Sequence, residues 1–441
     1  MNTYTNEHLA SLVREDSVHR DVYTDPEIFQ LEMQRIWGRA WIYVGHESQV
    51  KEPGDYFATT VARQPVIMTR HSDGKVYVLF NRCAHKGAQV VGDSCGHAKQ
   101  LRCCYHGWVY DTDGSLLHIP REEGYAGTGF DRTDPVNSLQ KVPRVDSYHG
   151  LVFANLSPQG VGLKTWLSGA ATSIDNLVER SPEGKIEIAG GCLRYMHDSN
   201  WKMFVENLND AMHPMVVHQS SSGTAKRVFH DKFGDDQEAV PFELEMLAPF
   251  TSDYEFFEKM GLTAWDYGHS VTGGEISIHS AYSPIPGYAE SLVARYGADK
   301  AKQILSVNRH NTVVYPGFTL KGAITAVRVV KPVAVNKTVI ESWVFRQVGA
   351  PEELFQRSIT YCNLINSHAN LVGPDDWEAY HRVQSGLEAG EQSEWVNMYR
   401  YLHADKVAGK DTKTAIGTSD MVFRHQYQTW KNYMTDTRAA A

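Results

Sequence analysis

Two short stretches of the 441-residue chain, NRCAHKGAQV (81–90) and RCCYHGWVY (102–110), decide how its first half folds. The first holds a Cys-x-His pair and the second a Cys-x-x-His pair, with 17 residues between the two pairs. Two thiolates and two imidazoles on two tight loops predict a metal site. The four candidate ligands are Cys83, His85, Cys103 and His106.

The arrangement of these ligands favours one metal group over another. Zinc accepts two Cys and two His in a tetrahedron, whereas a Rieske [2Fe–2S] cluster has two Cys on one iron and two His on the other. A zinc finger carries both Cys on one knuckle and both His on a helix. Here each loop supplies one Cys and one His, which suits a cluster with two unlike irons. A zinc site, in a zinc-dependent binding protein, stays as the alternative.

The surroundings of the two loops predict β-structure. Residues 66–70 and 75–81 flank the turn sequence His71-Ser72-Asp73-Gly74, which is typical of a hairpin. A second turn follows at 111–114, and residues 150–156 read as a further strand. We therefore expect an all-β region over 56–118.

The rest of the chain mixes helices and strands. Asp25-Pro26 predicts the start of a helix, with Asp as N-cap and Pro at the first helical position. Apolar spacing predicts a helix over 165–180, and residues 351–368 and 376–389 read as two helices separated by Gly373-Pro374. Strand-like segments occur between them without a regular βαβ rhythm, so the predicted fold class is α+β.

Composition excludes several classes of protein. Hydrophobic residues make up 42% and charged residues 22% of the chain, as in a folded globular protein. A net charge of −9 argues against a nucleic-acid partner. No apolar run approaches the roughly 18 residues of a membrane span, and no secretory signal is visible. We therefore expect a cytoplasmic protein without membrane contacts, whose six cysteines serve metal binding more than disulfides.

The stretch NWKMFVENLNDAMHPMVVH (200–218) holds a second group of candidate ligands. Helical spacing predicts an apolar face and, opposite to it, a polar face with Glu206, Asp210 and His213. Pro214 predicts a kink or local widening that turns His213 and His218 toward one point. Two His with one carboxylate form the facial triad of non-haem Fe(II) oxygenases. The predicted apolar face consists of Trp201, Phe204, Val205, Leu208 and Met212.

These motifs resemble those of one family, the Rieske non-haem iron oxygenases that hydroxylate aromatic rings. NRCAHKG and CCYHGW resemble its CxHxG and CxYHGW cluster loops, and DAMHPMVVH resembles the DxxHxxxxH motif of its large (alpha) subunit. The resemblance implies that His213 and His218 are iron ligands. It implies that Asp210 is a bridge, linking His213 to the cluster ligand His106 of the partner subunit. The cluster ligands it implies are Cys83, His85, Cys103 and His106.

The third iron ligand is expected in GPDDWEAYHRVQSGL (373–387), which resembles the family's distal segment. Aligning on Gln384 places the ligand at Asp376. Asp375 is the alternative ligand, and it could instead cap the following helix, a common role for Asp.

The resemblance covers nearly the whole chain and implies its organisation. A Rieske [2Fe–2S] domain (40–158) is inserted in a helix-grip (START/Bet v1-like) catalytic domain, formed by 1–39 and 159–441, with an antiparallel sheet. The implied assembly is a homotrimer (α3), or α3β3 with a small beta subunit. Electrons from NADH reach the cluster through a separate reductase, with or without a ferredoxin, and pass to a mononuclear Fe(II).

The implied reaction uses O2 and gives a cis-dihydrodiol of an aromatic ring, as in aromatic catabolism. A monooxygenase or demethylase on the same scaffold is one alternative, and a Rieske electron carrier without oxygenase activity is another. Asn207 and Asn366 stand at positions near the family's pocket, where hydrocarbon sites favour apolar side chains. Together with Arg328, they favour a polar or carboxylated aromatic substrate. A purely structural role of Arg328 in its strand is the alternative.

Overall fold

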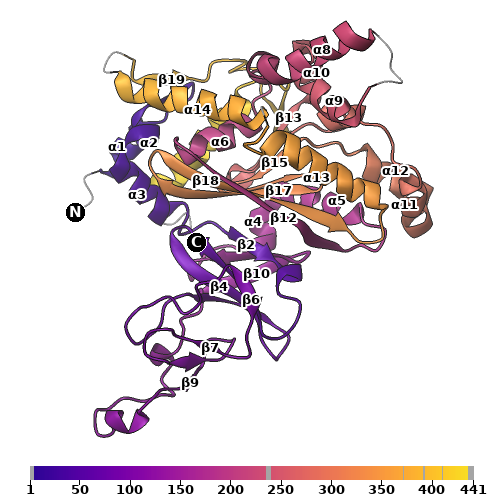
Figure 1. Ribbon diagram of the computed structural model, residues 1–441. Helices are drawn as coiled ribbons and strands as arrows, with labels where there is room; N and C mark the ends of the chain where they lie inside the picture. Colours follow the sequence, from indigo (N-terminus) through magenta and orange to yellow (C-terminus); the bar gives the residue numbers. More distant parts are fainter. Residues whose placement is uncertain (1–3, 235–239, 371, 391–392, 410, 436–441) are drawn as a thin grey trace. The chain divides into compact units, whose positions relative to one another are not determined.

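The computed structural model describes residues 4–234, 240–370, 372–390, 393–409 and 411–435 (Figure 1). These residues divide into two compact units. The small unit is Trp37–Leu163, and the large unit joins the N-terminal segment up to Ile36 with the part from Lys164 onward. The chain thus leaves the large unit, forms the small one and returns. The boundaries drawn from the sequence, 39/40 and 158/159, lie close to this division and stay a prediction of domain limits.

The small unit consists of three antiparallel sheets with strand orders β5-β4-β3-β6, β7-β8-β9 and β10-β11-β2. The expected hairpin is confirmed, because β4 pairs with β5 around the turn at residues 71–74. The strands are β2 (Ile42–His46), β3 (Asp55–Val61), β4 (Gln64–Arg70), β5 (Val76–Phe80), β6 (Cys95–His97), β7 (Leu101–Arg102), β8 (Val109–Tyr110), β9 (Leu116–His118), β10 (Arg144–Tyr148) and β11 (Leu151–Asn155).

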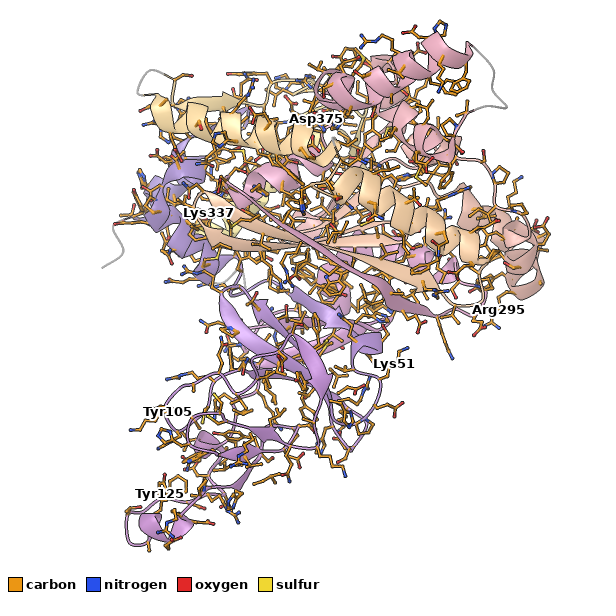
Figure 2. The ribbon with its side chains drawn as sticks, in the orientation of Figure 1. Lys51, Tyr105, Tyr125, Arg295, Lys337 and Asp375 are labelled. Carbon is orange, nitrogen blue, oxygen red and sulfur yellow. The ribbon has the colours of Figure 1, made fainter. Side chains whose placement is uncertain are left out.

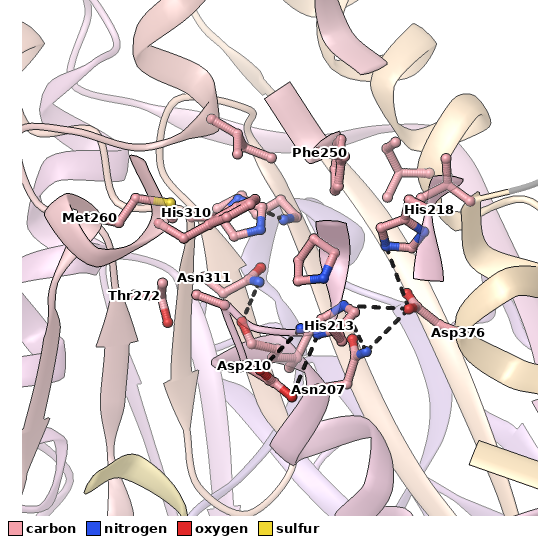
Figure 3. Close-up of a pocket in the computed structure, with 18 of the residues that line it drawn as sticks. Asn207, Asp210, His213, His218, Phe250, Met260, Thr272, His310, Asn311 and Asp376 are labelled. Carbon is pink, nitrogen blue, oxygen red and sulfur yellow. Dashed lines mark hydrogen bonds and ion pairs between the residues drawn. The ribbon is translucent and has the colours of Figure 1, made fainter. Parts of the chain in front are cut away.

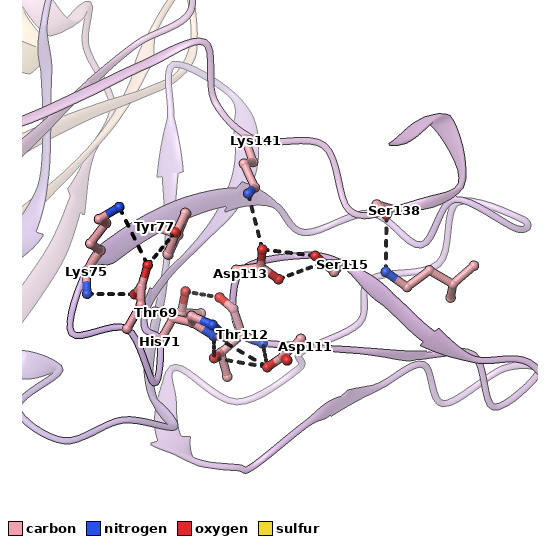
Figure 4. A network of polar contacts seen from close by, with 12 residues as sticks. Thr69, His71, Lys75, Tyr77, Asp111, Thr112, Asp113, Ser115, Ser138 and Lys141 are labelled. Carbon is pink, nitrogen blue, oxygen red and sulfur yellow. Dashed lines mark hydrogen bonds and ion pairs between the residues drawn. The ribbon is translucent and has the colours of Figure 1, made fainter. Parts of the chain in front are cut away.

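Polar contacts tie the two turns of the small unit together (Figure 4). Thr69 Oγ1 donates a hydrogen bond to the carbonyl of Thr112 at 2.6 Å, and His71 Nδ1 lies 2.8 Å from Thr112 Oγ1. Asp113 accepts from Ser115 at 2.9 Å and pairs with Lys141 at 3.4 Å. These contacts fix the scaffold from which the two cluster loops project.

The large unit is built on a nine-stranded antiparallel sheet with the order β12-β18-β17-β16-β15-β14-β13-β21-β20. Strands β1 (Ser17–His19) and β19 (Trp395–Asn397) form a separate pair. The sheet strands are β12 (Ile186–His197), β13 (Leu262–Trp265), β14 (Ser270–Thr272), β15 (Asn311–Val314), β16 (Phe318–Lys321), β17 (Ala326–Ala334), β18 (Lys337–Gln347), β20 (Lys406–Gly409) and β21 (Thr412–Ala415).

Helices lie on both faces of this sheet (Figure 1). Helices α6, α13 and α14 cover the face that forms the pocket described below. Helix α5 packs on the other face, where Thr312 Oγ1 of β15 lies 2.9 Å from Ser173 Oγ. The α+β prediction is confirmed. The helices are α1 (Asn6–Ser11), α2 (Asp21–Thr24), α3 (Pro26–Arg35), α4 (Leu163–Leu167), α5 (Ala171–Glu179), α6 (Trp201–Leu208), α7 (Pro214–Val217), α8 (Thr224–Phe233), α9 (Phe242–Leu247), α10 (Tyr254–Met260), α11 (Tyr288–Tyr296), α12 (Ala298–Ser306), α13 (Glu352–Asn366), α14 (Val372–Ala389) and α15 (Met421–Thr435).

Two predictions about helix ends had different outcomes. Asp25 caps α3 as expected, because its Oδ1 accepts from the backbone N–H groups of Glu27 and Ile28 at 2.7 and 2.9 Å. The prediction that Gly373-Pro374 separates two helices is wrong, since α14 begins at Val372 and contains both residues. A proline is tolerated in a first helical turn, where its missing N–H has no intrahelical partner. None of the described helices is long and apolar enough to cross a membrane.

A buried ion pair joins the N-terminal segment to the rest of the large unit. Lys202 Nζ lies 2.6 Å from Glu32 Oε1, and both side chains are fully buried. The indole N–H groups of Trp201 and Trp430 also donate to this carboxylate, at 2.8 and 2.6 Å. The carboxylate of α3 therefore anchors α6, the helix that leads into the functional site, and the C-terminal helix α15.

We predict that Lys202→Met lowers the free energy of unfolding of the large unit by about 3–5 kcal/mol, because it leaves the buried Glu32 carboxylate without its cation. Urea denaturation followed by fluorescence measures the change. The exposed Lys302 provides a matched control, and Lys302→Met should change the free energy by less than about 0.5 kcal/mol. Equal midpoints for the two variants would contradict the anchoring role.

Candidate active site

The two cluster loops of the small unit have the same backbone geometry. In each loop the Cys N–H donates to the carbonyl five residues later, at 2.8 Å for both Cys83 and Cys103. The N–H groups of Gly87 and Gly107 donate back to the Cys carbonyls, at 2.9 and 3.1 Å. Both glycines have positive φ, 78° and 74°, which other residues rarely adopt. This shared turn presents a Cys and a His side by side in each loop.

The structure brings the four predicted cluster ligands together. The Cys83 and Cys103 side chains are buried in one hydrophobic cluster. The ring centroids of His85 and His106 lie 4.6 Å apart, and the His85 ring stacks on Trp108. His85 is half-buried and His106 is exposed, as is the neighbouring Tyr105 (Figure 2). The thiols therefore form the inner side of the site and the imidazoles its outer side.

This donor set fits a [2Fe–2S] cluster with unlike irons. Tyr110 Oη lies 3.1 Å from Cys83 Sγ and accepts from the N–H of Ala84 at 3.1 Å. Burial raises the pKa of the Cys83 thiol, whereas the contact with Tyr110 acts in the opposite direction. His85 Nδ1 is buried and has no hydrogen-bond partner in the described part of the chain. An imidazole nitrogen of this kind is a donor atom suited to a metal.

The second group of ligands is formed where α6 ends. The predicted helix through Asp210 and His213 is wrong, because α6 stops at Leu208 and the chain continues as a loop. Pro214 begins the short helix α7 (Pro214–Val217), and the expected widening occurs after His218 instead, in the π-helical turn η5 (Gln219–Gly223). The break in the helix, and not a shared helical face, determines where these side chains point.

Three side chains converge in the large unit (Figure 3). Asp376 Oδ1 lies 3.5 Å from His213 Nε2 and 3.6 Å from His218 Nε2. One ligand atom from each residue lies within 4.8 Å of the other two, a spacing that suits a single metal ion. The side-chain amide Nδ2 of Asn207 lies at the same point, 3.1 Å from His213 Nε2 and 3.2 Å from Asp376 Oδ1. Two imidazoles and a carboxylate are the donors of a facial triad.

A second carboxylate stands behind each histidine. Asp210 Oδ2 lies 3.8 Å from His213 Nδ1, and Asp375 Oδ2 lies 3.4 Å from His218 Nδ1. Asp210 is held in turn by the backbone N–H of Met212, which donates to its Oδ1 at 2.6 Å. The Nδ1 side of each ring is thus occupied, which directs its Nε2 toward Asp376.

The expectation that Asp375 caps a helix is wrong, because α14 begins three positions earlier, at Val372. Its carboxylate instead accepts hydrogen bonds from the hydroxyls of Ser220 and Ser221, at 2.6 and 2.7 Å. The π-helical turn that contains these serines thereby attaches to α14, where Figure 2 labels Asp375. Of the two neighbouring aspartates, Asp376 is the one that meets both histidines.

The electrostatics of the Asp210–His213 pair are those of a charged pair. Burial alone would raise the pKa of Asp210, but hydrogen bonds with His213 and the Met212 N–H outweigh it and the net pKa is lowered. Burial would lower the pKa of His213, but the hydrogen bond and the charge of Asp210 outweigh that effect and the net pKa is raised. Asp210 is therefore ionised at neutral pH and faces the Nδ1 side of the ring.

The triad opens into a pocket of about 540 Å³, a volume that includes space open to solvent. Of the predicted pocket residues, Asn207 and Arg328 line it, and Asn366 does not. Asn366 is buried at the end of α13, where its Nδ2 lies 3.4 Å from Cys362 Sγ. The prediction that Asn366 lines this pocket is therefore wrong. The apolar walls of the pocket include Leu208, Phe250, Phe257, Met260, Ile278, Tyr361, Ile365 and Val372.

Four polar residues of the pocket were not predicted from the sequence, namely Thr272, His310, Asn311 and Lys321. A signal was available for Lys321, because it continues the alternation of GFTLK (317–321) on the same face as Thr319. His310 and Asn311 begin a strand with no local pattern that marks them as pocket residues.

Comparison with known proteins identifies two family domains in the chain. Residues 40–143 match the family described as Rieske [2Fe-2S] domain, and residues 163–436 match the family described as Ring hydroxylating alpha subunit (catalytic domain). The toluate 1,2-dioxygenase subunit alpha of Pseudomonas putida is 30% identical over 393 residues, which are 87% of this chain and 83% of that protein. The 2-halobenzoate 1,2-dioxygenase large subunit of Burkholderia cepacia is 29% identical over 384 residues, 86% of this chain and 79% of that protein.

A solved structure of naphthalene 1,2-dioxygenase with indole bound in the active site has a similar fold. Its TM-score is 0.80 at 22% identity, and the match covers 97% of this chain and 94% of that one. The family match over residues 163–436 extends over more than half of the chain, and a Rieske domain precedes it. The chain therefore belongs to the ring-hydroxylating oxygenase alpha subunits, enzymes that carry a Rieske domain and a catalytic domain in one polypeptide.

Proposed function

We propose that His213, His218 and Asp376 hold the mononuclear iron of this oxygenase, and that the iron stands beside a substrate bound in the adjoining pocket. The observation that carries the proposal is the meeting of three ligand atoms within 4.8 Å at that pocket. The cluster is proposed to bind through Cys83, His85, Cys103 and His106.

The proposed reaction converts an aromatic ring, O2, NADH and a proton into a cis-dihydrodiol and NAD+. Both oxygen atoms enter the ring, and the two electrons come from NADH through a separate reductase, with or without a ferredoxin. When bound, the cluster supplies one-electron transfer and the iron supplies O2 activation. A cytoplasmic location, where NADH is available to the reductase, is part of the same proposal.

The chain's own residues orient the ligands and shape the site. The carboxylates of Asp210 and Asp375 face Nδ1 of His213 and His218, at 3.8 and 3.4 Å, which favours a proton on Nδ1 and leaves Nε2 as the atom for a metal. The apolar walls keep bulk water from the site. Asp210 is further proposed to link His213 to His106 of the partner subunit in a trimer, α3 or α3β3. The names of the relatives as alpha or large subunits support such an assembly.

The sequence is also compatible with two other activities, electron transfer and monooxygenation or demethylation. An electron carrier needs no facial triad and no pocket beside it, so the convergence of His213, His218 and Asp376 argues for an oxygenase. A monooxygenase or demethylase would use the same residues, and only the products distinguish it. The relatives are named for toluate, 2-halobenzoate and benzene, which include both aromatic acids and a hydrocarbon. The substrate class of this chain therefore has to be inferred from the residues of its own pocket.

We predict that Cys83→Ser abolishes the visible absorption of the cluster, because a serine hydroxyl is a poor replacement for a thiolate ligand. The absorption spectrum of the purified variant measures this. Cys104→Ser is the matched control, since Cys104 neighbours a ligand but is exposed, and its spectrum should be unchanged. A retained spectrum in Cys83→Ser would refute the ligand assignment.

We predict that Asp376→Ala loses about one iron atom per chain and keeps the two irons and the spectrum of the cluster. Asp375→Asn should keep that iron but bind it about 10- to 100-fold more weakly, because His218 loses its orienting carboxylate. Iron analysis after dialysis against graded chelator measures both. If Asp376→Ala keeps its iron while Asp375→Asn loses it, the two roles are reversed.

We predict that Asp210→Asn keeps both metal groups but slows electron transfer between them about 10- to 100-fold, because the ring of His213 loses its charged partner. The rate at which the reduced cluster's absorption changes on addition of O2 and substrate reports this step. The control is Asp231→Asn, at an exposed aspartate of α8. A wild-type rate in Asp210→Asn would remove the bridging role.

A further inference from the structure

Two cations line the pocket beside the proposed iron site and have no acidic partner among the described residues. Lys321 is 2% exposed and Arg328 is 7% exposed. The nearest polar contact of the Lys321 ammonium is His310 Nδ1, at 3.5 Å, and its Nζ lies 5.3 Å from the Tyr361 ring centroid. The guanidinium of Arg328 donates to Asn311 Oδ1 at 2.6 Å and lies over the Phe204 ring.

The sheet register places both cations on the pocket face. Thr319 pairs with Arg328, so their side chains share a face, and Lys321 follows Thr319 by two positions. Val313 also pairs with Thr319, which puts Asn311 on that same face. A positive charge from β16 and one from β17 therefore point into the same space as His213, His218 and Asp376.

The contrast with Lys202 shows what is unusual about this pair. Lys202 is also fully buried, but the Glu32 carboxylate lies 2.6 Å from its ammonium. Lys321 has no ion-pair partner among the described residues; burial and the charge of Arg328 lower its pKa well below the usual range, against the opposite effect of the Asp376 charge. A buried cation without a counter-charge costs free energy, and a carboxylate that enters the pocket would offset that cost.

Arg328 has further N–H donors available to such an anion. A guanidinium carries five N–H groups, and one of them is used by Asn311 in the described residues. Its planar fork matches the two oxygens of a carboxylate. In Figure 3, Asn311 and His310, which contact the two cations, lie across the pocket from Asp376. An aromatic acid bound at the cations would extend toward the triad between apolar walls.

We propose that Lys321 and Arg328 form an anion subsite that binds the carboxylate of an aromatic acid and thereby presents its ring to the iron. The inference rests on the proposed function, since it takes the triad as the reacting centre. The inference assigns the substrate class, an aromatic acid, from the charges of Lys321 and Arg328. Neutral arenes of the same size would leave both buried cations uncompensated and bind more weakly.

Anaerobic calorimetric titration of the iron-loaded enzyme with benzoate and with benzamide, its neutral isostere, tests the subsite. Benzoate should bind about 10- to 100-fold more tightly than benzamide, as for a hydrogen bond to a charged group. Lys321→Met and Arg328→Gln should each remove most of this preference, mainly by weakening benzoate binding. Lys321→Arg should retain it. The control is Lys331→Met, a cation of β17 that pairs with Glu341 at 2.9 Å and does not line the pocket.

The outcomes separate this inference from the proposed function. Equal affinity of the wild type for benzoate and benzamide, or an unchanged preference in both Lys321→Met and Arg328→Gln, overturns the subsite. Retained benzamide binding in a variant shows that its pocket is folded. The same preparations are then given O2 and chemical reductant. Selective benzoate binding without any oxygenated product supports the subsite and contradicts the proposed function.

Discussion

The active site depends on one geometric constraint, namely that two imidazole rings must present their Nε2 atoms to the same carboxylate oxygen. Asp376 Oδ1 lies 3.5 and 3.6 Å from those atoms. The chain meets the constraint by ending α6 at Leu208 and following His218 with a π-helical turn. Asp210 faces the Nδ1 atom of His213, and Asp375 faces that of His218. The buried Glu32–Lys202 pair anchors α6.

Features with local signals were predictable from the sequence. The N-cap at Asp25, the hairpin at residues 71–74 and the α+β class follow from turn chemistry and periodicity. Ligand spacings identified the Cys and His candidates, whereas the choice of Asp376 came from the family resemblance. The end of α6 was not predictable, because its apolar period continues beyond Leu208. Asn209 hydrogen-bonds with β14 residues more than 60 positions away, and this competes with helical continuation.

The charge of the pocket was only partly predictable from the sequence. Arg328 stood out in its strand, but the burial of Lys321 results from strand pairing and from helices that arrive later in the chain. Asn366 illustrates the reverse case, since its position in α13 directs its amide to Cys362 and away from the cavity. For both Lys321 and Asn366, the direction of the side chain in the folded protein determines whether the residue lines the pocket. The pocket joins His213, His218 and Asp376 with two basic side chains that have no ion-pair partner in the described part of the chain, an arrangement suited to orienting an anionic ring.

The central claim is that this site inserts both atoms of O2 into an aromatic ring. The most direct test is a single turnover of the chemically reduced enzyme with benzoate under 18O2, followed by mass analysis of the product. The account predicts a dihydrodiol that carries two labelled oxygen atoms. A product with one labelled oxygen, or no product from enzyme with its full iron content, would contradict it.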